Sequence, residues 1–551
     1  MINSNIHKNP NKPLTVLGIH KDPWHNTGAC IIKDDGENTK IAFLSEERLD
    51  RVKDSRGFPE LSIKACMQQV GVKSYEEFDF IVMDYIENKN WHLDQFKRMC
   101  KQDVFLKNIN KEKIFTVNHH LLHACSVYFS SGFNSAAVLI VDGRGSLKET
   151  QSLYAAKGNE IKLIDKTDKI GIGLLYAAVT HDIGWTILQE GKTMGLAPYG
   201  EKVKKKIYNF PNKFEGIVTD YSEFCEEGNY KIKQAHDKPI TFEDKARAAF
   251  EVQEECEKAL LHLAKYSKTT GMNNLCISGG VGLNSVSNNK IRIHQPKLFD
   301  DIFINPAASD TGIPFGAALY GYHILGKKQT NNYPLSPFLG PTYSNNDIEH
   351  AINSNSDNNK VFYCIKENSF EIASKLLKHN YIVANFQGRS EMGPRALGNR
   401  SILMSPMGNE NKDRLNLRVK HREGFRPFAP AVLEERASEF FEIDAQSPYM
   451  LFICDVKKEK RKILPAITHV DGSARLQTLT KNRNGKFYDL VKKFGEETGV
   501  PVLLNTSFNV NGEPIVETPD NAIKCFINTD IDALLIENFI LIKSNIDKSF
   551  F

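Results

Sequence analysis

Two histidines spaced four residues apart are the first candidates for chemistry in this sequence. His119 and His123 lie in the segment HHLLHACSVYF. A helix places residues i and i+4 on one face, so both imidazoles can turn toward one cation while His120 turns away. Imidazole suits iron, zinc and other divalent transition metals. Asp142 and Asp310 each follow an apolar run and are candidate carboxylate ligands. Solvated histidines at a polar helix start are the alternative.

Three glycine-rich turns form a second group of candidates. Each lies beside an apolar run typical of a strand, and glycine lets backbone N–H groups approach phosphate oxygens closely. None is a Walker motif, and the pattern GxGxxG is absent. The turns predict a nucleotide cleft, unless they serve only as tight turns in a large α/β domain. They are GKTMGLAPYG (191–200), ISGGVGLNS (277–285) and SDTGIPFGAA (309–318).

An excess of positive charge lies between residues 389 and 426. Nine basic side chains stand against four acidic ones in this stretch, and guanidinium groups bind phosphates and carboxylates bidentately. The loop GRSEMGPRALGNRS carries three arginines outside any helical face, which favours phosphate binding over a solvated basic surface. A later segment, LLNTSFNVNGEP (503–514), supplies Asn505, Ser507 and Asn509 as donors for an acyl oxygen or a ribose.

Short apolar runs bounded by Gly, Asp or Asn predict the strands that would position these groups. A strand–turn–strand pattern occurs over 13–48, with its third strand expected at 40–48, and again over 136–169, which indicates two related subdomains. Residues 244–268 have helical periodicity, and the Asn-, Ser- and Pro-rich stretch 326–360 indicates a connection between domains. Buried strands are expected at 275–280, 381–387 and 500–508. The expected fold class is therefore α/β.

The composition excludes several classes of protein. The 551 residues carry a net charge of +4, with 41% hydrophobic and 25% charged residues, so no basic excess points to nucleic acid. No apolar run approaches a membrane span, and no signal peptide is expected at the N-terminus. Ten scattered cysteines without a CxxC pair fit a reduced, cytoplasmic protein. The sequence contains no GxSxG elbow, so it does not indicate a serine nucleophile.

Ten segments, in chain order across nearly the whole sequence, resemble the O-carbamoyltransferases of the NodU/CmcH family, which modify nodulation factors, cephems and aminoglycosides. The segments are HNTGACII, SEERLDRVK, HHLLHACSVYFSSGF, AAVLIVDG, EGKTMGLAPYG, ISGGVGLNS, NPAASDTGIPFGAAL, GRSEMGPRALGNRSIL, FRPFAPAVL and LLNTSFNVNGEPIVETP. VDGRG departs from the family's VDG-hydrophobic-G, and Arg144 would add positive charge near the expected metal.

The resemblance implies two domains with separate tasks. Residues 1–345 would form an actin-like ATPase fold of two related subdomains, and residues 346–551 a YrdC-like α/β domain. The YrdC-like domain would make carbamoyl-AMP from Mg-ATP and carbamoyl phosphate. The actin-like domain would then transfer the carbamoyl group to a hydroxyl of a small-molecule or sugar-containing acceptor, as in secondary metabolite biosynthesis.

The resemblance also implies roles for individual residues. His25 would face the acceptor pocket, and Asp244 would act as general base, unless it only caps its helix. A divalent metal, expected to be iron although zinc or manganese also fits, would be held by His119, His123, Asp142 and Asp310. Substrate and nucleotide would be bound by Arg48, Arg51, Lys192, Gly279, Gly280, Asn284, Arg389, Arg395, Arg418, Lys420, Arg422, Asn505, Ser507 and Asn509.

Three other functions are compatible with parts of this pattern. A threonylcarbamoyl-transfer enzyme acting on tRNA would share both domain types, but the near-neutral charge and the domain order argue against it. A non-catalytic nucleotide-dependent regulator would not need the complete set of His, Asp and Arg positions. A hydrogenase-maturation enzyme would also have an acylphosphatase segment and CxxC zinc fingers, and this sequence has neither. Residues 77–112 and 201–243 are expected to select the acceptor. Neither the identity of the acceptor nor the oligomeric state follows from the sequence.

Overall fold

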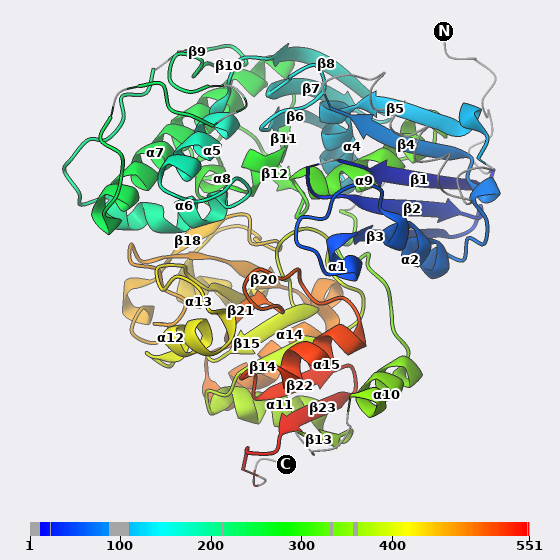
Figure 1. Ribbon diagram of the computed structural model, residues 1–551, viewed down its shortest axis with the longest axis vertical. Helices are drawn as coiled ribbons and strands as arrows, with labels where there is room; N and C mark the ends of the chain where they lie inside the picture. Colours follow the sequence, from blue (N-terminus) through cyan, green and yellow to red (C-terminus); the bar gives the residue numbers. More distant parts are fainter. Residues whose placement is uncertain are drawn as a thin grey trace. The chain divides into compact units, whose positions relative to one another are not determined.

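The chain has a mixed α/β fold and divides into two compact units (Figure 1). Unit 1 comprises Met1–Glu46 and Asp54–Pro337, and unit 2 comprises Glu47–Lys53 and Phe338–Phe551. The computed structural model describes residues 12–22, 24–86, 109–211, 213–226, 230–234, 236–330, 334–355 and 362–547, together with Gly228 and Ser549. Residues 87–108, most of the predicted specificity stretch 77–112, lie outside the described residues.

Unit 1 contains two five-stranded sheets with the same strand pattern. The first has the order β3-β2-β1-β4-β5 and the second β8-β7-β6-β11-β12; in each, an antiparallel meander of three strands is extended by two parallel strands. The strand–turn–strand pattern that repeats in the sequence therefore occurs as two sheets. The strands are β1 (Leu14–His20), β2 (Gly28–Asp34), β3 (Thr39–Ser45), β4 (Phe80–Tyr85), β5 (Ile114–Asn118), β6 (Ser135–Val141), β7 (Gln151–Lys157), β8 (Glu160–Thr167), β11 (Asn274–Ser278) and β12 (Asp301–Ile304).

Two helices of unit 1 pack against these sheets and against each other. Helix α4 (His119–Ser131) contacts β6 and β11, helix α9 (Ile313–Leu319) contacts β1 and β2, and the two helices contact each other. Glycines permit the close packing: a Cβ atom at Gly18 would lie 2.1 Å from the carbonyl oxygen of Pro314, and one at Gly316 would lie 2.0 Å from that of Leu122. The residues just before α9 are thereby fixed beside α4.

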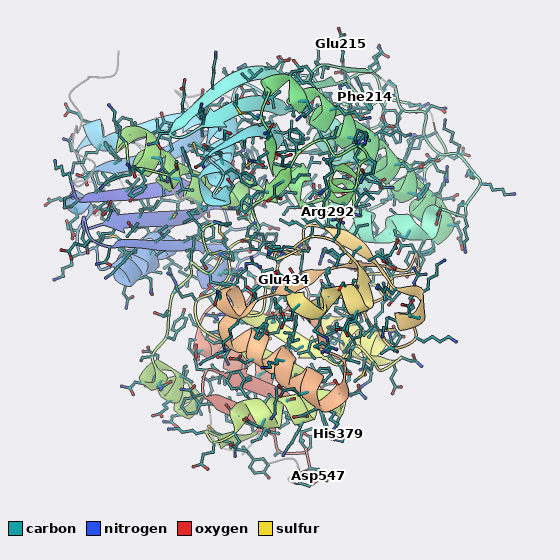
Figure 2. The ribbon with its side chains drawn as sticks, turned by 180° about the vertical axis from the view of Figure 1, so that it is seen from behind. Phe214, Glu215, Arg292, His379, Glu434 and Asp547 are labelled. Carbon is teal, nitrogen blue, oxygen red and sulfur yellow. The ribbon has the colours of Figure 1, made fainter. Side chains whose placement is uncertain are left out.

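The remaining helices of unit 1 include the long helix that the sequence predicts. The periodicity predicts a helix over 244–268, and α7 spans Phe242–Ser267, with Thr241 capping its N-terminus. Helix α7 packs against α5, α6 and α8. In its C-terminal half, His262 lies beside Phe214 of the short β9–β10 hairpin, at a ring-centroid distance of 5.5 Å. Figure 2 labels Phe214 and Glu215 of this hairpin. The other elements are α2 (Glu60–Val70), α5 (Ile172–Asp182), α6 (Glu190–Leu196), α8 (Ser285–Arg292), β9 (Phe214–Glu215) and β10 (Val218–Thr219).

Unit 2 is built on an eight-stranded sheet with a core on each face. The strand order is β13-β23-β22-β14-β15-β21-β16-β20, and β17-β18-β19 form a smaller sheet. Successive side chains of a strand point to opposite faces, so Val383 packs with Leu376 and Leu490 on one face, while Ala384 packs with Phe526 on the other.

The elements of unit 2 have the following bounds. The strands are β13 (Phe362–Ile365), β14 (Val383–Phe386), β15 (Arg400–Met404), β16 (Ala429–Leu433), β17 (Phe441–Glu442), β18 (Ile453–Val456), β19 (Ser473–Arg475), β20 (Gln477–Leu479), β21 (Val502–Ser507), β22 (Ala533–Ile536) and β23 (Phe539–Lys543). The helices are α1 (Glu47–Asp50), α10 (Asn345–Ser354), α11 (Ser369–Lys378), α12 (Asn411–Leu415), α13 (Ala437–Phe440), α14 (Lys481–Thr498) and α15 (Pro519–Ile527). No helix in the described ranges is both long and apolar enough to cross a membrane.

The predicted strand at 40–48 is shorter than the sequence suggests. Strand β3 ends at Ser45, and the short helix α1 begins at Glu47. The side chain of Glu46 explains the break, because its carboxylate accepts hydrogen bonds from the backbone N–H groups of Leu61 (2.9 Å) and Ser62 (2.7 Å) at the start of α2. The chain therefore leaves the sheet at this point.

We expect Gly316→Ala to destabilise unit 1. The new methyl group would collide with the backbone of α4, and overpacking of this kind costs about 1–3 kcal/mol. Urea unfolding of the full chain measures the effect. Gly191→Ala is the matched control, because Gly191 is also helical and a Cβ atom added there would point into open space. This control should be neutral or slightly stabilising, and equal midpoints for the two variants would contradict the packing of α9 on α4.

Candidate functional site

Helix α4 begins with the paired histidines and places both in the interior of unit 1. The Asn118 side chain caps the helix by accepting from the Leu121 N–H at 2.9 Å, and the His119 N–H donates to Ser146 Oγ at 2.9 Å. His119 and His123 are both fully buried. The solvated-histidine alternative is therefore excluded for these two side chains.

Two aspartates from other elements converge on the two imidazoles. Asp142 follows β6, and Asp310 precedes α9. Asp142 Oδ2 lies 3.3 Å from His119 Nε2 and 3.5 Å from His123 Nε2; Asp310 Oδ1 lies 3.4 and 3.3 Å from the same two nitrogens. The two Nε2 atoms are 3.1 Å apart. All four ligand atoms lie within 4.8 Å of one another.

This arrangement fits one divalent metal ion. Four ligands held tetrahedrally at about 2.0–2.1 Å from an ion would lie about 3.3 Å from one another, close to the separations observed. The outer ring nitrogens face away from the centre: His119 Nδ1 donates to Asp84 Oδ2 at 2.7 Å, and His123 Nδ1 lies 3.3 Å from Ser278 Oγ. Both Nε2 atoms therefore point toward the common centre of the cluster, as metal-ligating imidazoles require.

The electrostatics of the four-residue cluster favour positive charge between its two carboxylates. Burial raises the pKa of Asp142 and Asp310, but the adjacent imidazoles outweigh it and hold both pKa values below their ordinary range. Burial lowers the pKa of His119, whereas the Asp310 charge and hydrogen bonds to three carboxylates raise it well above its usual value. The two carboxylates are therefore ionised, and a positive charge among them is stabilised.

Sequence reasoning missed the carboxylate that orients His119. Asp84 is buried at the end of β4 and bridges His119 Nδ1 (2.7 Å) and His20 Nδ1 (2.9 Å). Burial raises the pKa of Asp84, but the His20 charge and both imidazole hydrogen bonds bring it below its ordinary value. A charged residue at the end of the apolar run FDFIVMDY was the available signal. Its partner, 35 positions away, was not visible.

The glycine turn after β11 lies against the cluster. The Gly280 N–H donates to Asp142 Oδ1 at 2.9 Å. Gly279 has a φ of 91°, and a Cβ atom there would lie 2.3 Å from the Val141 carbonyl oxygen, so the turn requires glycine. Asn284, expected to bind nucleotide, instead caps α8 by accepting from the Ser287 N–H at 3.0 Å.

The two predicted catalytic residues have different surroundings. His25 Nδ1 lies 3.7 Å from Asp310 Oδ2, with 22% of its side chain exposed, so it borders the metal cluster. Asp244 lies in the first turn of α7, where Lys205 Nζ is 3.4 Å from its Oδ1. A hydrogen bond with Thr241 and this lysine lower the pKa of Asp244, which weakens it as a base. The Lys192 ammonium lies 6.0 Å from the Trp185 ring centroid.

Unit 2 gathers cationic side chains around one buried lysine. Lys420 Nζ donates to both the carbonyl and side-chain oxygens of Ser507 (2.9 and 3.2 Å) and of Asn509 (2.8 and 2.6 Å). Burial lowers the pKa of Lys420 well below its usual value, and Arg422 and Arg426 lower it further. The end of β21 and the basic stretch are thereby joined.

The arginines of this cluster depress one another's pKa. Burial and then Arg426 lower the pKa of Arg395 to about 10 and that of Arg422 to about 9. Sequence reasoning missed Arg475; burial and then Arg395, Arg422 and Arg426 hold its pKa well below the usual range. Among the described residues that shift these pKa values, Glu423 is the acidic side chain near Arg422 and Arg426. Such an excess of buried positive charge is suited to a polyanion.

Several predicted anion ligands contact protein groups in this structure. Arg389 donates to the carbonyl oxygens of Gly340 (2.8 Å) and Leu339 (2.6 Å). Arg418 Nε lies 3.4 Å from Asp530 Oδ2. Other contacts of this kind are Asn505 Nδ2 to Gln477 Oε1 (2.9 Å), Arg48 Nη2 to the Gly393 carbonyl (3.1 Å), and Arg51 Nη1 to the Ile515 carbonyl (2.7 Å).

Comparison with known proteins gives two family matches in chain order. Residues 84–319 match the carbamoyltransferase N-terminus, and residues 374–543 match the carbamoyltransferase C-terminus. Full-length HypF in its phosphate- and nucleotide-bound form is a structural neighbour at 14% identity, covering 58% of this chain and 57% of HypF. Its TM-score of 0.32 is too low to define the fold.

Curated relatives align with most of the chain. Nodulation protein NolNO of Sinorhizobium fredii is 34% identical over 94% of this chain and 79% of its own length. Nodulation protein NolO of Bradyrhizobium diazoefficiens is 37% identical over 78% of this chain and 79% of its own length. Because both family models match in order and these relatives align over most of their length, the chain belongs to the carbamoyltransferase family and is a carbamoyltransferase enzyme.

Proposed function

We propose that this protein is an ATP-dependent O-carbamoyltransferase that forms carbamoyl-AMP in unit 2 and uses it in unit 1. The cationic cluster around Lys420 carries the proposal, because its buried positive charges call for a ligand with several phosphate groups. In this proposal unit 1 has an actin-like ATPase fold and unit 2 a YrdC-like fold. The repeated sheet pattern of unit 1 supports the first assignment.

The reaction of unit 2 would join two phosphorylated substrates. Water would first release phosphate from carbamoyl phosphate to give carbamate. A carbamate oxygen would then attack the α-phosphorus of Mg-ATP, and the bond from that phosphorus to pyrophosphate would break, which gives carbamoyl-AMP. Negative charge develops on the departing pyrophosphate, and preorganised cations stabilise such charge without reorganising. Arg395, Arg422, Arg426 and Arg475 would supply these cations, with Lys420 holding Ser507 and Asn509 in place.

The reaction of unit 1 would transfer the carbamoyl group to a hydroxyl. The hydroxyl oxygen attacks the carbamoyl carbon, the bond from that carbon to the AMP oxygen breaks, and AMP leaves with the electron pair. A divalent metal, in our proposal iron, would act as a Lewis acid on phosphate oxygens. His119, His123, Asp142 and Asp310 would hold it. We favour His25 over Asp244 as acceptor of the hydroxyl proton, because Lys205 pairs with Asp244.

Formation of carbamoyl-AMP without any acceptor tests the proposal. The full chain, Mg-ATP and carbamoyl phosphate should yield carbamoyl-AMP by mass spectrometry and pyrophosphate by a coupled assay. Arg395→Ala removes a cation that stabilises developing charge and should slow the reaction about 100-fold or more. Lys420→Ala should also slow it, because Ser507 and Asn509 lose the group that holds them. His119→Ala, in unit 1, should retain it.

The control for the adenylation assay is Lys492→Ala. This lysine is 57% exposed and should leave the rate unchanged. A folded wild-type protein that releases no pyrophosphate would rule out the adenylate route and favour a nucleotide-dependent regulator.

Metal content tests the cluster independently of activity. We expect His119→Ala and Asp310→Ala to abolish stoichiometric binding of iron, zinc or manganese, because each removes one of four converging ligands. Equilibrium dialysis with elemental analysis measures the bound metal. His181→Ala, at an exposed position of α5, should bind like the wild type. Equal metal content in His119→Ala and His181→Ala would contradict the assignment.

Asp84→Asn should weaken metal binding without removing a ligand. Loss of the carboxylate partner leaves the His119 ring without its fixed tautomer, and changes of this kind reduce metal affinity about 10–100-fold. Competition with a chromophoric chelator measures the dissociation constant. Asp182→Asn is a useful comparison, since Asp182 accepts from His236 and Tyr208 outside the cluster. Unchanged affinity in Asp84→Asn would remove its orienting role.

A further inference from the structure

A short segment from the N-terminal part of the sequence belongs structurally to unit 2. Residues Glu47–Lys53 pack with Phe338–Phe551, whereas the chain on both sides belongs to unit 1. The preceding residue, Glu46, is fixed in unit 1 by the backbone N–H groups of Leu61 and Ser62. These seven residues are therefore part of unit 2, although they lie far from the rest of it in the sequence.

Arg48 is the buried anchor of this segment. Its side chain is only 4% exposed, and its Nη1 lies 3.6 Å from Glu517 Oε2. Its Nη2 donates to the carbonyl oxygen of Gly393 at 3.1 Å. One guanidinium thus holds two loops that are distant in the sequence.

The partner carboxylate depends on Arg48 for compensation of its charge. Glu517 is fully buried, and its other oxygen lies 3.6 Å from Arg400 Nη2. Neither Glu517 oxygen has a hydrogen-bond partner in the part of the chain that the structure describes. Removal of Arg48 would leave Glu517 with Arg400 as its remaining guanidinium neighbour. Breaking a buried ion pair by removing one partner is far more harmful than removing both partners.

Arg51 binds the backbone of the loop that leads to Glu517. Its Nη1 donates to the Ile515 carbonyl at 2.7 Å and its Nη2 to the Pro514 carbonyl at 2.8 Å. Arg51 itself has a φ of 63° and directly follows α1, which ends at Asp50. Both arginines that the resemblance assigned to phosphate thus donate hydrogen bonds to backbone carbonyls.

The two fastened loops carry the groups of the anion site. Gly393 lies two residues before Arg395, whose pKa is lowered by burial and by Arg426. Pro514 and Ile515 belong to the segment that begins at Asn509, an acceptor for Lys420. A small shift of either loop would move these groups relative to a bound phosphate.

We propose that Arg48 and Arg51 are positioning residues of the carbamoyl-adenylate site in unit 2 and are not themselves phosphate ligands. The proposal rests on the proposed function for the identity of the ligand. Arg48 sets the distance between the Arg395 loop and the Asn509 loop, and Glu517 is the buried charge through which it acts.

A double-mutant cycle in the full chain separates positioning from direct binding. Arg48→Met should raise the KM for carbamoyl phosphate by up to about 100-fold in the pyrophosphate-release assay, the scale reached by misplaced groups remote from the chemistry. The double variant Arg48→Met, Glu517→Gln removes both charges and should recover most of this loss. Arg400 would retain the carbonyl oxygens of Gln387, Gly388 and Asn399 as acceptors.

Hydrogen exchange provides a readout that does not need turnover. Amides of residues 393–397 and 513–517 should exchange faster in Arg48→Met and return toward the wild-type rate in the double variant. Arg436→Met is the matched control, because its ion pair with Glu439 is 45% and 44% exposed and also lies in unit 2. It should change neither KM nor exchange.

Each result has a distinct meaning. A double variant as impaired as Arg48→Met in KM, with normal exchange in both, would show that Arg48 contacts phosphate and would overturn the proposal. Unchanged exchange and unchanged KM in Arg48→Met would overturn it as well. If the wild type releases no pyrophosphate, the proposed function fails, and the exchange pattern by itself decides whether Arg48 positions the loops.

Discussion

The burial of ionised groups is the constraint on which this structure depends. Isolated charges are expensive to remove from water, so they persist inside a protein only beside partners of opposite charge or a bound ion. In unit 1 two imidazoles and two carboxylates meet this condition together, and each imidazole Nε2 lies 3.1 to 3.5 Å from the other ligand atoms. The close packing of α9 on α4, which Gly316 permits, brings Asp310 to the histidines.

Unit 2 meets the same constraint in two opposite ways. Arg48, Glu517 and Arg400 form a compensated group, in which one buried carboxylate lies between two guanidinium groups. Around Lys420 positive charge is in excess despite the nearby Glu423, and burial together with the mutual repulsion of the cations lowers the pKa of Arg422 and Arg475. The first group is complete without a ligand and stabilises loops. The second is favourable only when an anion is present, which is why we propose it as the binding site.

Local patterns in the sequence predicted the elements and part of the site. The periodicity over 244–268 is found as α7, and the repeated strand–turn–strand pattern as two sheets of equal strand order. The i, i+4 histidines share one helix face. The predicted end of β3 was wrong, because the Glu46 carboxylate binds the start of α2, a contact across 15 positions that no local pattern contains.

The sequence by itself determined the residue types, the helix that pairs His119 with His123, and membership of the family. Only the tertiary structure decided that Asp84 orients His119, that Arg475 joins the cationic cluster, and that Arg48 pairs with Glu517. The physical reason is that helices and strands follow short-range periodicity, whereas the partner of a buried charge is chosen by whichever distant segment reaches it during packing. Such contacts leave no spacing signal in a single sequence.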